Sequence, residues 1–521
     1  MKNFKRLYYM RIRIGQTAGF TLLICLMAMP LTAQLLAPDS AFNPVVRSRV
    51  TSGFLIDNDS YYDVELGDMP AGLDHPFSGI GKFGNAVIDF FRIGEPRQHM
   101  LDYAFADTII AFKSRLNVIA GYDHRIEEED SYGFWYKGFR FNSKLGESFR
   151  LRALWWNGGF YGDLDAAADA PLIDGWHTHK KNTIQMDNLN ADISFRNRYL
   201  TAALGRGKFR VGDNISGSII LNDHANDFGY LLSEGKIGAF TLSFMHGSLM
   251  ADSTRNVKLA DESFSDKYIA IHQISYRHKD LWQIFGGESI IYGNRSIDVN
   301  YLLPHTFWRV TEHNQGDRDN VMIYAGATYD PHRNARIYLT AALDELRYAE
   351  LFGNWWGNKW AVQSGVALDL PALSFTENLP PRLTLELTAV RPWTYTHYMN
   401  HTMYSHDGRP LGYPKGSNLM DISLEANLPV ASFLYLDSIV SYTKQGSYGS
   451  SWQLNYGDWF SGAQIDNATA DWFEGEISQT WRLISTIRFS AMAHNAFIIG
   501  HDTRWDPSPR HHIVAGWQLS Y

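Results

Sequence analysis

The sequence contains one cysteine, Cys25, and no run of 18 consecutive apolar residues beyond its first 33 positions. The missing apolar runs disfavour transmembrane helices. The sequence also lacks a Gly-x-Ser-x-Gly elbow, a P-loop and a dinucleotide-binding fingerprint, which are common signatures of hydrolases, nucleotide-binding proteins and dehydrogenases. We therefore expect neither a helical membrane protein nor an enzyme with a familiar catalytic motif.

The first 33 residues have the pattern of a secretory signal. An apolar run extends from Phe20 to Leu31, and Thr32-Ala33-Gln34 follows it. Basic residues precede the run at five positions, namely Lys2, Lys5, Arg6, Arg11 and Arg13. This arrangement predicts a signal peptide over residues 1–33 that is cleaved after Ala33. Because Cys25 lies inside the signal, the exported chain has no cysteine for a disulfide, a thiolate metal site or a nucleophile.

Positive charge is scarce outside the signal. Without its five basic residues, the 47 Lys and Arg fall to 42 against 55 Asp and Glu, a net charge near −13. Such a balance disfavours nucleic acid as a partner. The mean hydropathy is −0.26, although aromatic residues make up 14% of the chain. A polar, aromatic-rich, exported chain fits a membrane barrel that crosses lipid with strands; a large secreted β-protein is the alternative.

Beyond the signal, the sequence has no long apolar runs, but in several segments apolar and polar residues alternate. In the last strand, Ile513–Tyr521, every second residue is apolar, and the final residue is aromatic. The same alternation occurs in residues 336–344, 382–390 and 486–491. A period of two places the apolar side chains on one face of a strand, as a transmembrane β-barrel requires.

The connections between these strands alternate between short and long. Short connections are predicted at 277–280, 330–334 and 427–431, and long ones at 208–227, 293–320, 391–418 and 444–467. Counting back from a periplasmic C-terminus puts every long loop outside the cell. We therefore predict an all-β protein of the bacterial outer membrane. Its antiparallel barrel of 18 strands spans residues 113–521, with the first strand beginning near Leu116, and residues 34–112 form a partly helical plug in the periplasm or the lumen.

The 391–418 connection concentrates aromatic rings beside polar side chains. This mixture suits a sugar, because rings stack on its C–H faces and polar groups bond its hydroxyls. The candidate polysaccharide-binding residues are Trp393, Tyr395, His397, Tyr404, His406, Arg391, Lys208 and Arg210. The three cations would assist if the polymer is acidic. The alternative is that the rings form an outer aromatic girdle or pack the loops together.

Charged residues within strands predict a network that lines the lumen. Its candidate members are Arg206, Glu288, Asp344, Glu345 and Glu386. Acid–base catalysis by the carboxylates is the alternative interpretation. The Asn- and Asp-rich stretch 222–227 lacks the spacing of an EF-hand loop. We expect no metal and no cofactor.

Several segments between residues 200 and 420 occur together in a characteristic order. They are 205–212, 217–223, 287–292, 300–305, 319–320, 343–345 and 391–418, of which the run Arg-Pro-Trp-Thr-Tyr-Thr-His is the most specific. Together they resemble the outer-membrane capsule assembly protein Wzi family, including relatives linked to gliding motility. Gly207 and Val211 depart from the pattern, where an acid and a tryptophan are expected. The resemblance implies an 18-stranded barrel with a periplasmic helical plug and an outer face that acts as a lectin for capsular polysaccharide.

The expected function is therefore non-catalytic attachment of capsular or other exopolysaccharide to the cell surface. A porin or exporter barrel for oligosaccharides is the main alternative, and an open lumen would favour it. An outer-membrane hydrolase is less favoured, because the sequence supplies no nucleophile–base pair. The expected partners are surface polysaccharide, outer-membrane lipid and the barrel assembly machinery, without nucleic acid.

Overall fold

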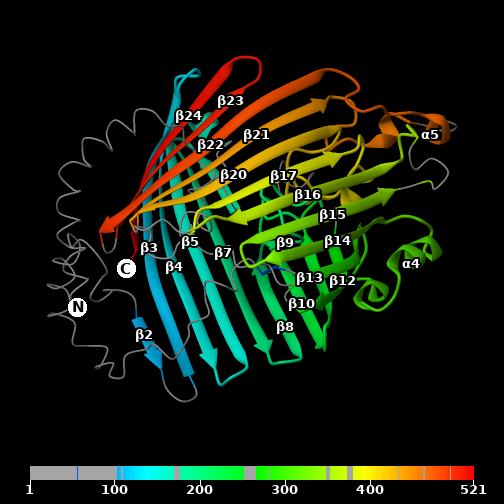
Figure 1. Ribbon diagram of the computed structural model, residues 1–521, viewed down its shortest axis with the longest axis horizontal. Coiled ribbons are helices and arrows are strands. Elements are labelled where there is room, and N and C mark those ends of the chain that lie inside the picture. The colour runs from blue at the N-terminus through cyan, green and yellow to red at the C-terminus, as the bar shows by residue number, and fades with distance from the viewer. Residues whose placement is uncertain are drawn as a thin grey trace.

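The chain folds into a closed antiparallel β-barrel (Figure 1). The computed structural model describes residues 55–56, 103–106, 110–168, 176–251, 266–279, 281–345, 347, 353–371, 380–431, 433–460, 464–492 and 495–520. Within these residues 18 strands pair in a single ring, which confirms the predicted barrel and its strand number. The predicted signal at 1–33 and nearly all of the predicted plug at 34–112 lie outside the described residues.

Each strand of the ring pairs with the next one along the chain. The first nine strands are β3 (Ile110–Arg125), β4 (Asp130–Leu145), β5 (Phe149–Gly162), β7 (Thr183–Arg196), β8 (Leu200–Gly207), β10 (Phe228–Ile237), β11 (Phe240–Leu249), β12 (Lys267–His278) and β13 (Trp282–Gly293). The other nine are β14 (Asn320–His332), β15 (Ala335–Glu345), β16 (Lys359–Asp369), β17 (Arg382–Val390), β20 (Leu419–Ala431), β21 (Leu434–Gly446), β22 (Ile477–Met492), β23 (Asn495–Trp505) and β24 (Pro509–Ser520).

Shorter elements lie beside the ring or in its connections. The short strands are β1 (Leu55–Ile56), β2 (Tyr103–Ala106), β6 (Trp176–Lys180), β9 (Phe209–Arg210), β18 (Ser405–His406) and β19 (Arg409–Pro410). The helical segments are α3 (Leu164–Ala168), η4 (Val299–Leu302), α4 (Trp308–Asn314), η6 (Asn400–Thr402), η7 (Tyr456–Asp458) and α5 (Gln464–Asn467). Among the described residues, no helix has the length and apolar character needed to cross a membrane.

The outer wall of the barrel is apolar. On β17, Leu385 and Leu387 are 43% and 49% exposed, while Thr384, Glu386 and Thr388 are buried on the lumenal side. Other strands repeat this pattern with exposed side chains such as Ile274, Ile284, Leu339, Leu424 and Phe497. Because alternate residues of a strand share a face, the alternation in the sequence becomes an apolar belt, which is the surface that a transmembrane barrel presents to lipid.

The connections differ in length at the two ends of the barrel. At one end, adjacent strands are joined by short turns such as 238–239, 279–281 and 333–334. At the other end lie connections such as 208–227, 294–319, 391–418 and 447–476. We call these the turn end and the loop end. In Figure 1, α4 and α5, which belong to two of the long connections, lie toward the right of the view.

The ring closes between β24 and β3. Residues His512 through Ser520 pair with Arg125 through Asn117. On β24, Ile513 is exposed, whereas Val514 and Gln518 are buried, which confirms the predicted closing strand for the described residues. Tyr521 lies outside them.

The first strand is longer than the sequence indicated. β3 begins at Ile110 rather than near Leu116, because its ladder with β4 continues as far as Leu145. The short strand β2 extends this region further, since Tyr103 through Ala106 pair back onto β3.

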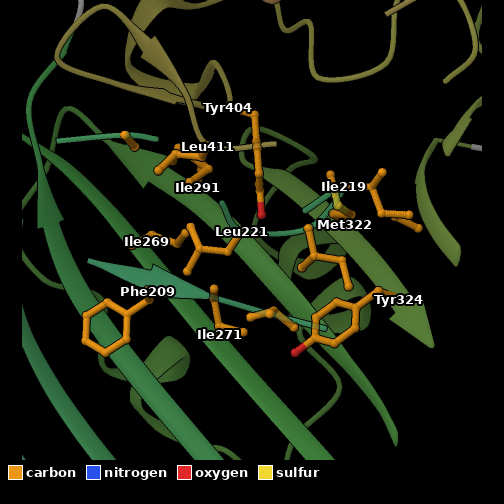
Figure 2. Packing of buried hydrophobic residues seen from close by; sticks show 14 of the residues in the cluster. Phe209, Ile219, Leu221, Ile269, Ile271, Ile291, Met322, Tyr324, Tyr404 and Leu411 are labelled. Atoms are coloured by element: carbon orange, nitrogen blue, oxygen red, sulfur yellow. The ribbon is translucent and has the colours of Figure 1, made fainter. Parts of the chain in front are cut away.

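Two long connections fold into the lumen and pack against the wall. The residues that they bury there include Phe209, Ile219, Leu221, Tyr404 and Leu411. The wall contributes inward side chains from β12, β13 and β14, namely Ile269, Ile271, Ile291, Met322 and Tyr324. Figure 2 shows these ten residues gathered in one cluster. A compact apolar core therefore fills part of the lumen.

Candidate functional site

The segment 391–396 forms a tight turn at the loop end. Trp393 and Tyr395 both have positive φ angles, 65° and 75°, in a region that non-glycine residues rarely adopt. The Trp393 backbone N–H donates to the Gly449 carbonyl (2.7 Å), and the Tyr395 backbone N–H donates to the Asp344 carboxylate (2.8 Å). A strained conformation persists only where its surroundings determine it, and such strain gathers at functional sites.

Tyr395 and Tyr404 hold the 391–418 connection inside the barrel. Their rings stack with centroids 5.8 Å apart, and neither has exposed surface. The Tyr395 hydroxyl donates to the Ile219 carbonyl (2.8 Å), and the Tyr404 hydroxyl shares a hydrogen bond with the Ser289 hydroxyl (2.9 Å). In this conformation, a polymer at the surface meets neither ring.

Both candidate histidines are buried. His406 Nδ1 accepts a hydrogen bond from the Met250 N–H (2.9 Å), and its Nε2 lies 3.2 Å from the Asp227 carbonyl, to which it donates. Burial lowers the pKa of His406 to about 4 and that of His397 to about 3, where the Lys359 ammonium adds to the effect. Both imidazoles are therefore neutral at pH 7 and offer no positive charge to a polymer.

The three candidate cations have different surroundings. The Arg391 guanidinium is buried, donates to the Ala470 carbonyl (3.0 Å) and lies 5.4 Å from the ring of Trp472, so it ties two long connections together. Arg210 forms an ion pair with Asp223. Lys208 is half-buried, two residues before Arg210.

The short strand β9 that contains Arg210 has a partner from far away in the sequence. Leu55 and Ile56 pair with Arg210 and Phe209. These two residues belong to the region predicted as a plug, and they lie against a connection that folds into the lumen. The plug itself remains a prediction.

Asp344 and Glu386 each hold one of the lumenal connections. Asp344 accepts the Tyr395 N–H described above. The two oxygens of Glu386 accept the backbone N–H groups of residues 215 and 216 at 2.9 and 3.0 Å, and one also accepts the Tyr338 hydroxyl at 2.6 Å. Buried Glu386 and half-buried Asp344 therefore position backbone rather than stand free for acid–base chemistry.

Arg206 and Glu288 do not lie where the sequence analysis placed them. Both face outward rather than into the lumen. Glu288 pairs across strands with His272 and with Ile323, which is 42% exposed on the outer wall, and directly paired residues share a face. Arg206 is exposed two positions after Leu204, which is 60% exposed on the same wall. The face is set by pairing with neighbouring strands, which one strand's sequence does not specify.

Sequence reasoning missed an aromatic cluster that joins three long connections at the loop end. Trp393 lies at its centre, with ring centroids at 5.0 Å from Phe460, 5.2 Å from Tyr448, 5.6 Å from Trp459 and 6.1 Å from Trp356. We call these five residues the aromatic platform. Its members come from residues 353–358, 391–396 and 446–460, so it exists only where the connections meet.

Trp459 is the exposed ring of the platform. Its side chain is 51% exposed, whereas Trp393 and Trp356 are buried. It meets Trp393 and Tyr448 edge to face, with interplanar angles of 68° and 78°. The signal available in the sequence was the density of seven aromatic residues between positions 446 and 477.

The connection around Trp459 is acidic. Residues 446–477 contain no Lys or Arg and five carboxylates, which are Asp458, Asp466, Asp471, Glu474 and Glu476. All five are exposed, and one of them, Asp466, pairs with Arg347. Nearby Lys359 is buried and lies 3.2 Å from Glu345, so it adds little positive charge to the surface. A field of this sign repels polyanions.

One cluster has the residue types of a metal site. Ligand atoms of Glu312, His313 and Asp317 lie within 4.8 Å of one another. Arg309 lies 3.1 Å from Glu312 and 3.5 Å from Asp317, so a guanidinium already balances these carboxylates. We assign no metal to this cluster.

No protein-family model and no curated protein matches this chain. Similar solved structures include Wzi of Escherichia coli, described as an outer-membrane protein involved in group 1 capsule assembly and a carbohydrate-binding β-barrel. It is 10% identical, with a TM-score of 0.49, over 77% of this chain and 84% of Wzi.

Two structures from Pseudomonas aeruginosa are also similar. OccK8 (OprE) is 8% identical, with a TM-score of 0.45, over 78% of this chain and 98% of its own. The outer membrane protein opdK is 11% identical, with a TM-score of 0.43, over 79% of this chain and 99% of its own. Because all three TM-scores are below 0.5, the fold assignment rests on the strand pairing of this chain.

Proposed function

We propose that this protein is a non-catalytic outer-membrane barrel that retains polysaccharide at the cell surface, with its loop end outside the cell. The exposed ring of Trp459, which packs edge to face on Trp393 and Tyr448 within the aromatic platform, carries the proposal. Solvent favours polar residues on a long connection, so an exposed, rigidly supported indole there suits stacking on the apolar face of a sugar. The sequence resemblance to capsule assembly proteins supports the same function.

The residues first singled out in the 391–418 connection act from beneath the surface in this proposal. Trp393, Tyr395 and Tyr404 are buried, so they position the platform and the turn that carries it. Arg391 links this connection to the one that carries Trp459, through the Ala470 carbonyl. Removing any of these side chains would therefore act through the shape of the loop end.

The charge around Trp459 narrows the class of polymer. Because the connection has five carboxylates and no cation of its own, a uronic acid polymer is repelled there. We propose a neutral polysaccharide or one that contains amino sugars. Arg210, which was expected to favour an acidic polymer, is paired with Asp223, and Lys208 adjoins that pair.

The two alternative functions, oligosaccharide transport and hydrolysis, receive less support. The lumenal connections narrow the path that transport through the barrel would use, because the apolar core that they share with the wall fills part of the lumen. Hydrolysis requires free carboxylates, but Asp344 and Glu386 are occupied by backbone N–H groups.

The proposal is tested with the purified full-length protein on arrays of neutral, amino-sugar and uronic polysaccharides. Trp459→Ala should weaken binding about 30-fold, since truncating an aromatic anchor often costs about 2 kcal/mol. Trp481→Ala is the matched control, because Trp481 is 52% exposed but lies on strand β22, away from the platform. It should bind as the wild type does.

Two results would contradict the proposal. Wild-type binding by the Trp459→Ala variant would move the binding surface elsewhere on the loop end. Absence of binding to every polysaccharide class, together with large ion conductance of the wild-type protein in planar bilayers, would replace retention by transport.

A further inference from the structure

The connection between β13 and β14 covers part of the barrel from outside. Its residues Tyr301 and Trp308 are buried and pack on wall residues of β11 to β14, which are Phe244, Ala270, Ile290, Tyr292 and Val321. Alternate residues of a strand share a face. Each of these wall residues therefore faces outward, because it lies an even number of positions along its own strand from an exposed wall residue, such as Ile274 on β12, Ile284 on β13 or Ile323 on β14. We call residues 294–319 the outer flap.

A polar pair on the outer wall anchors the flap. Glu288 accepts the backbone N–H groups of Trp308 and Arg309 at 2.7 and 3.2 Å, and lies 3.1 Å from His272 Nε2. The Trp308 ring stacks on the His272 ring, with centroids 4.1 Å apart and an interplanar angle of 19°. The flap therefore covers an ionisable pair that would otherwise face outward from the wall, where polar groups in lipid are unfavourable.

The flap exposes five large apolar side chains, with polar residues such as Asn300 and His305 exposed among them. Its exposed fractions are 49% for Ile297, 68% for Val299, 39% for Leu303, 76% for Phe307 and 60% for Val310. In Figure 1, α4 lies beside the ends of β12 and β14 at the loop end. Large apolar side chains that are exposed together within one short connection mark an interaction site.

The position of this apolar surface identifies its partner. Ile323 and Ile274, at 42% and 56% exposure, belong to the lipid-facing belt. They flank the anchor, because Ile323 pairs with Glu288 and Ile274 lies two positions from His272. The flap thus continues the belt along the same outer wall toward the loop end.

We infer that the outer flap rests in the lipid of the protein's own membrane, with Val299, Phe307 and Val310 at the boundary between headgroups and acyl chains. Short amphipathic segments with one apolar side bind lipid in this way. The flap extends lipid contact beyond the strands and seals Glu288 and His272 from the bilayer. This role is independent of polysaccharide binding.

The inference is tested by measuring the depth of single labelled cysteines in proteoliposomes. A Cys25→Ser background leaves the introduced cysteine as the sole label site. Val310→Cys carries an environment-sensitive dye, with Leu387→Cys on the belt as the lipid reference and Ser508→Cys in an exposed loop-end turn as the aqueous reference. If Val310→Cys does not assemble, Val299→Cys replaces it.

We expect the Val310 label to be quenched by lipids with a nitroxide near the headgroup, and at least fivefold less by aqueous iodide than the Ser508 label. Iodide quenching equal to that of the Ser508 label would overturn the inference, because the flap would then be in water. Protection from both quenchers would also overturn it, since a protein surface, such as a second copy of the chain, would then cover the flap.

Discussion

At the scale of single residues, exposure decides what a side chain at the loop end is able to do. Trp393 and Trp459 are in ring contact at 5.6 Å, yet one is fully buried and the other 51% exposed. The buried indole fixes the positions of three connections, while the exposed one is available to a ligand. The same distinction separates buried Arg391 from the exposed carboxylates around Trp459.

His406 should make the docking of the 391–418 connection depend on pH. Its folded-state pKa of about 4 lies below its ordinary value of 6.5, so the undocked connection binds a proton more readily. Docking free energy is therefore full above pH 6.5 and falls by up to about 3 kcal/mol as the pH drops toward 4. Hydrogen exchange, corrected for intrinsic rates, should show lower protection of residues 391–418 at pH 4.5 than at pH 7.5.

His406→Gln is the control for this effect, because glutamine stays neutral over the whole range and offers both an acceptor and a donor. The variant should lose part of the pH dependence, and His397→Gln should remove a further part. Equal protection of the wild-type connection at both pH values would refute the mechanism.

Glu386→Gln should loosen the 208–227 connection. The amide presents N–H groups where a carboxylate now accepts the N–H groups of residues 215 and 216, and an unsatisfied buried donor costs about 1–3 kcal/mol. Limited proteolysis with trypsin should then cut faster after Lys208 or Arg210. Glu147→Gln, in an exposed turn at the other end of the barrel, is the control and should leave the rate of this cleavage unchanged. If the control variant is also cut faster after Lys208 or Arg210, the effect is general destabilisation.

At the scale of elements, each strand depends on both neighbours, whereas each long connection depends on distant parts of the chain. The β17 ladder continues from Arg382↔Asn427 to Val390↔Leu419 without a register shift. The 391–418 connection that follows is held instead by contacts to Ile219, Asp344 and Gly449.

Deleting residues 518–521 should block assembly of the barrel. The deletion removes the pairs of Gln518, Leu519 and Ser520 with Ile119, Val118 and Asn117 and leaves this part of the edge of β3 unpaired. Unpaired backbone groups in lipid cost several kcal/mol each. Loss of the heat-dependent mobility shift on electrophoresis measures the defect. Ser520→Ala keeps the ladder and should assemble normally, whereas normal insertion of the truncated chain would show that these pairs are dispensable.

At the scale of the whole molecule, the two ends of the barrel differ. One end has short turns such as 238–239 and 279–281, and the other has the long connections, two of which bury residues in the lumen among the described residues. The outer flap and the aromatic platform both belong to the loop end. In our proposal the loop end faces the outside of the cell, so one end of the molecule meets both lipid and polysaccharide.

Epitope tags should reveal this orientation. A tag at 507–508, in an exposed turn of the loop end, should bind antibody on intact cells. A tag at 146–147, in an exposed turn of the turn end, should bind only after permeabilisation. The reverse result would invert the proposed orientation without changing the fold.

The sequence by itself determined the barrel, its strand number, the closing strand and the division into short and long connections. Alternation with a period of two is a local property, and lipid outside a barrel demands it on every strand. The exposed Leu385 and Leu387 beside buried Glu386 show this directly. Only the start of the first strand differed, because pairing with β4 extends it to Ile110.

Only the tertiary structure decided which loop residues are accessible and which way two strand charges face. Tyr395 is buried because its hydroxyl meets the Ile219 carbonyl, 176 residues away in sequence. Trp459 is exposed on a base that includes Trp393 from another connection, and Glu288 faces outward beneath the flap. Each outcome depends on contacts between segments that are distant in sequence, and no local periodicity encodes such contacts.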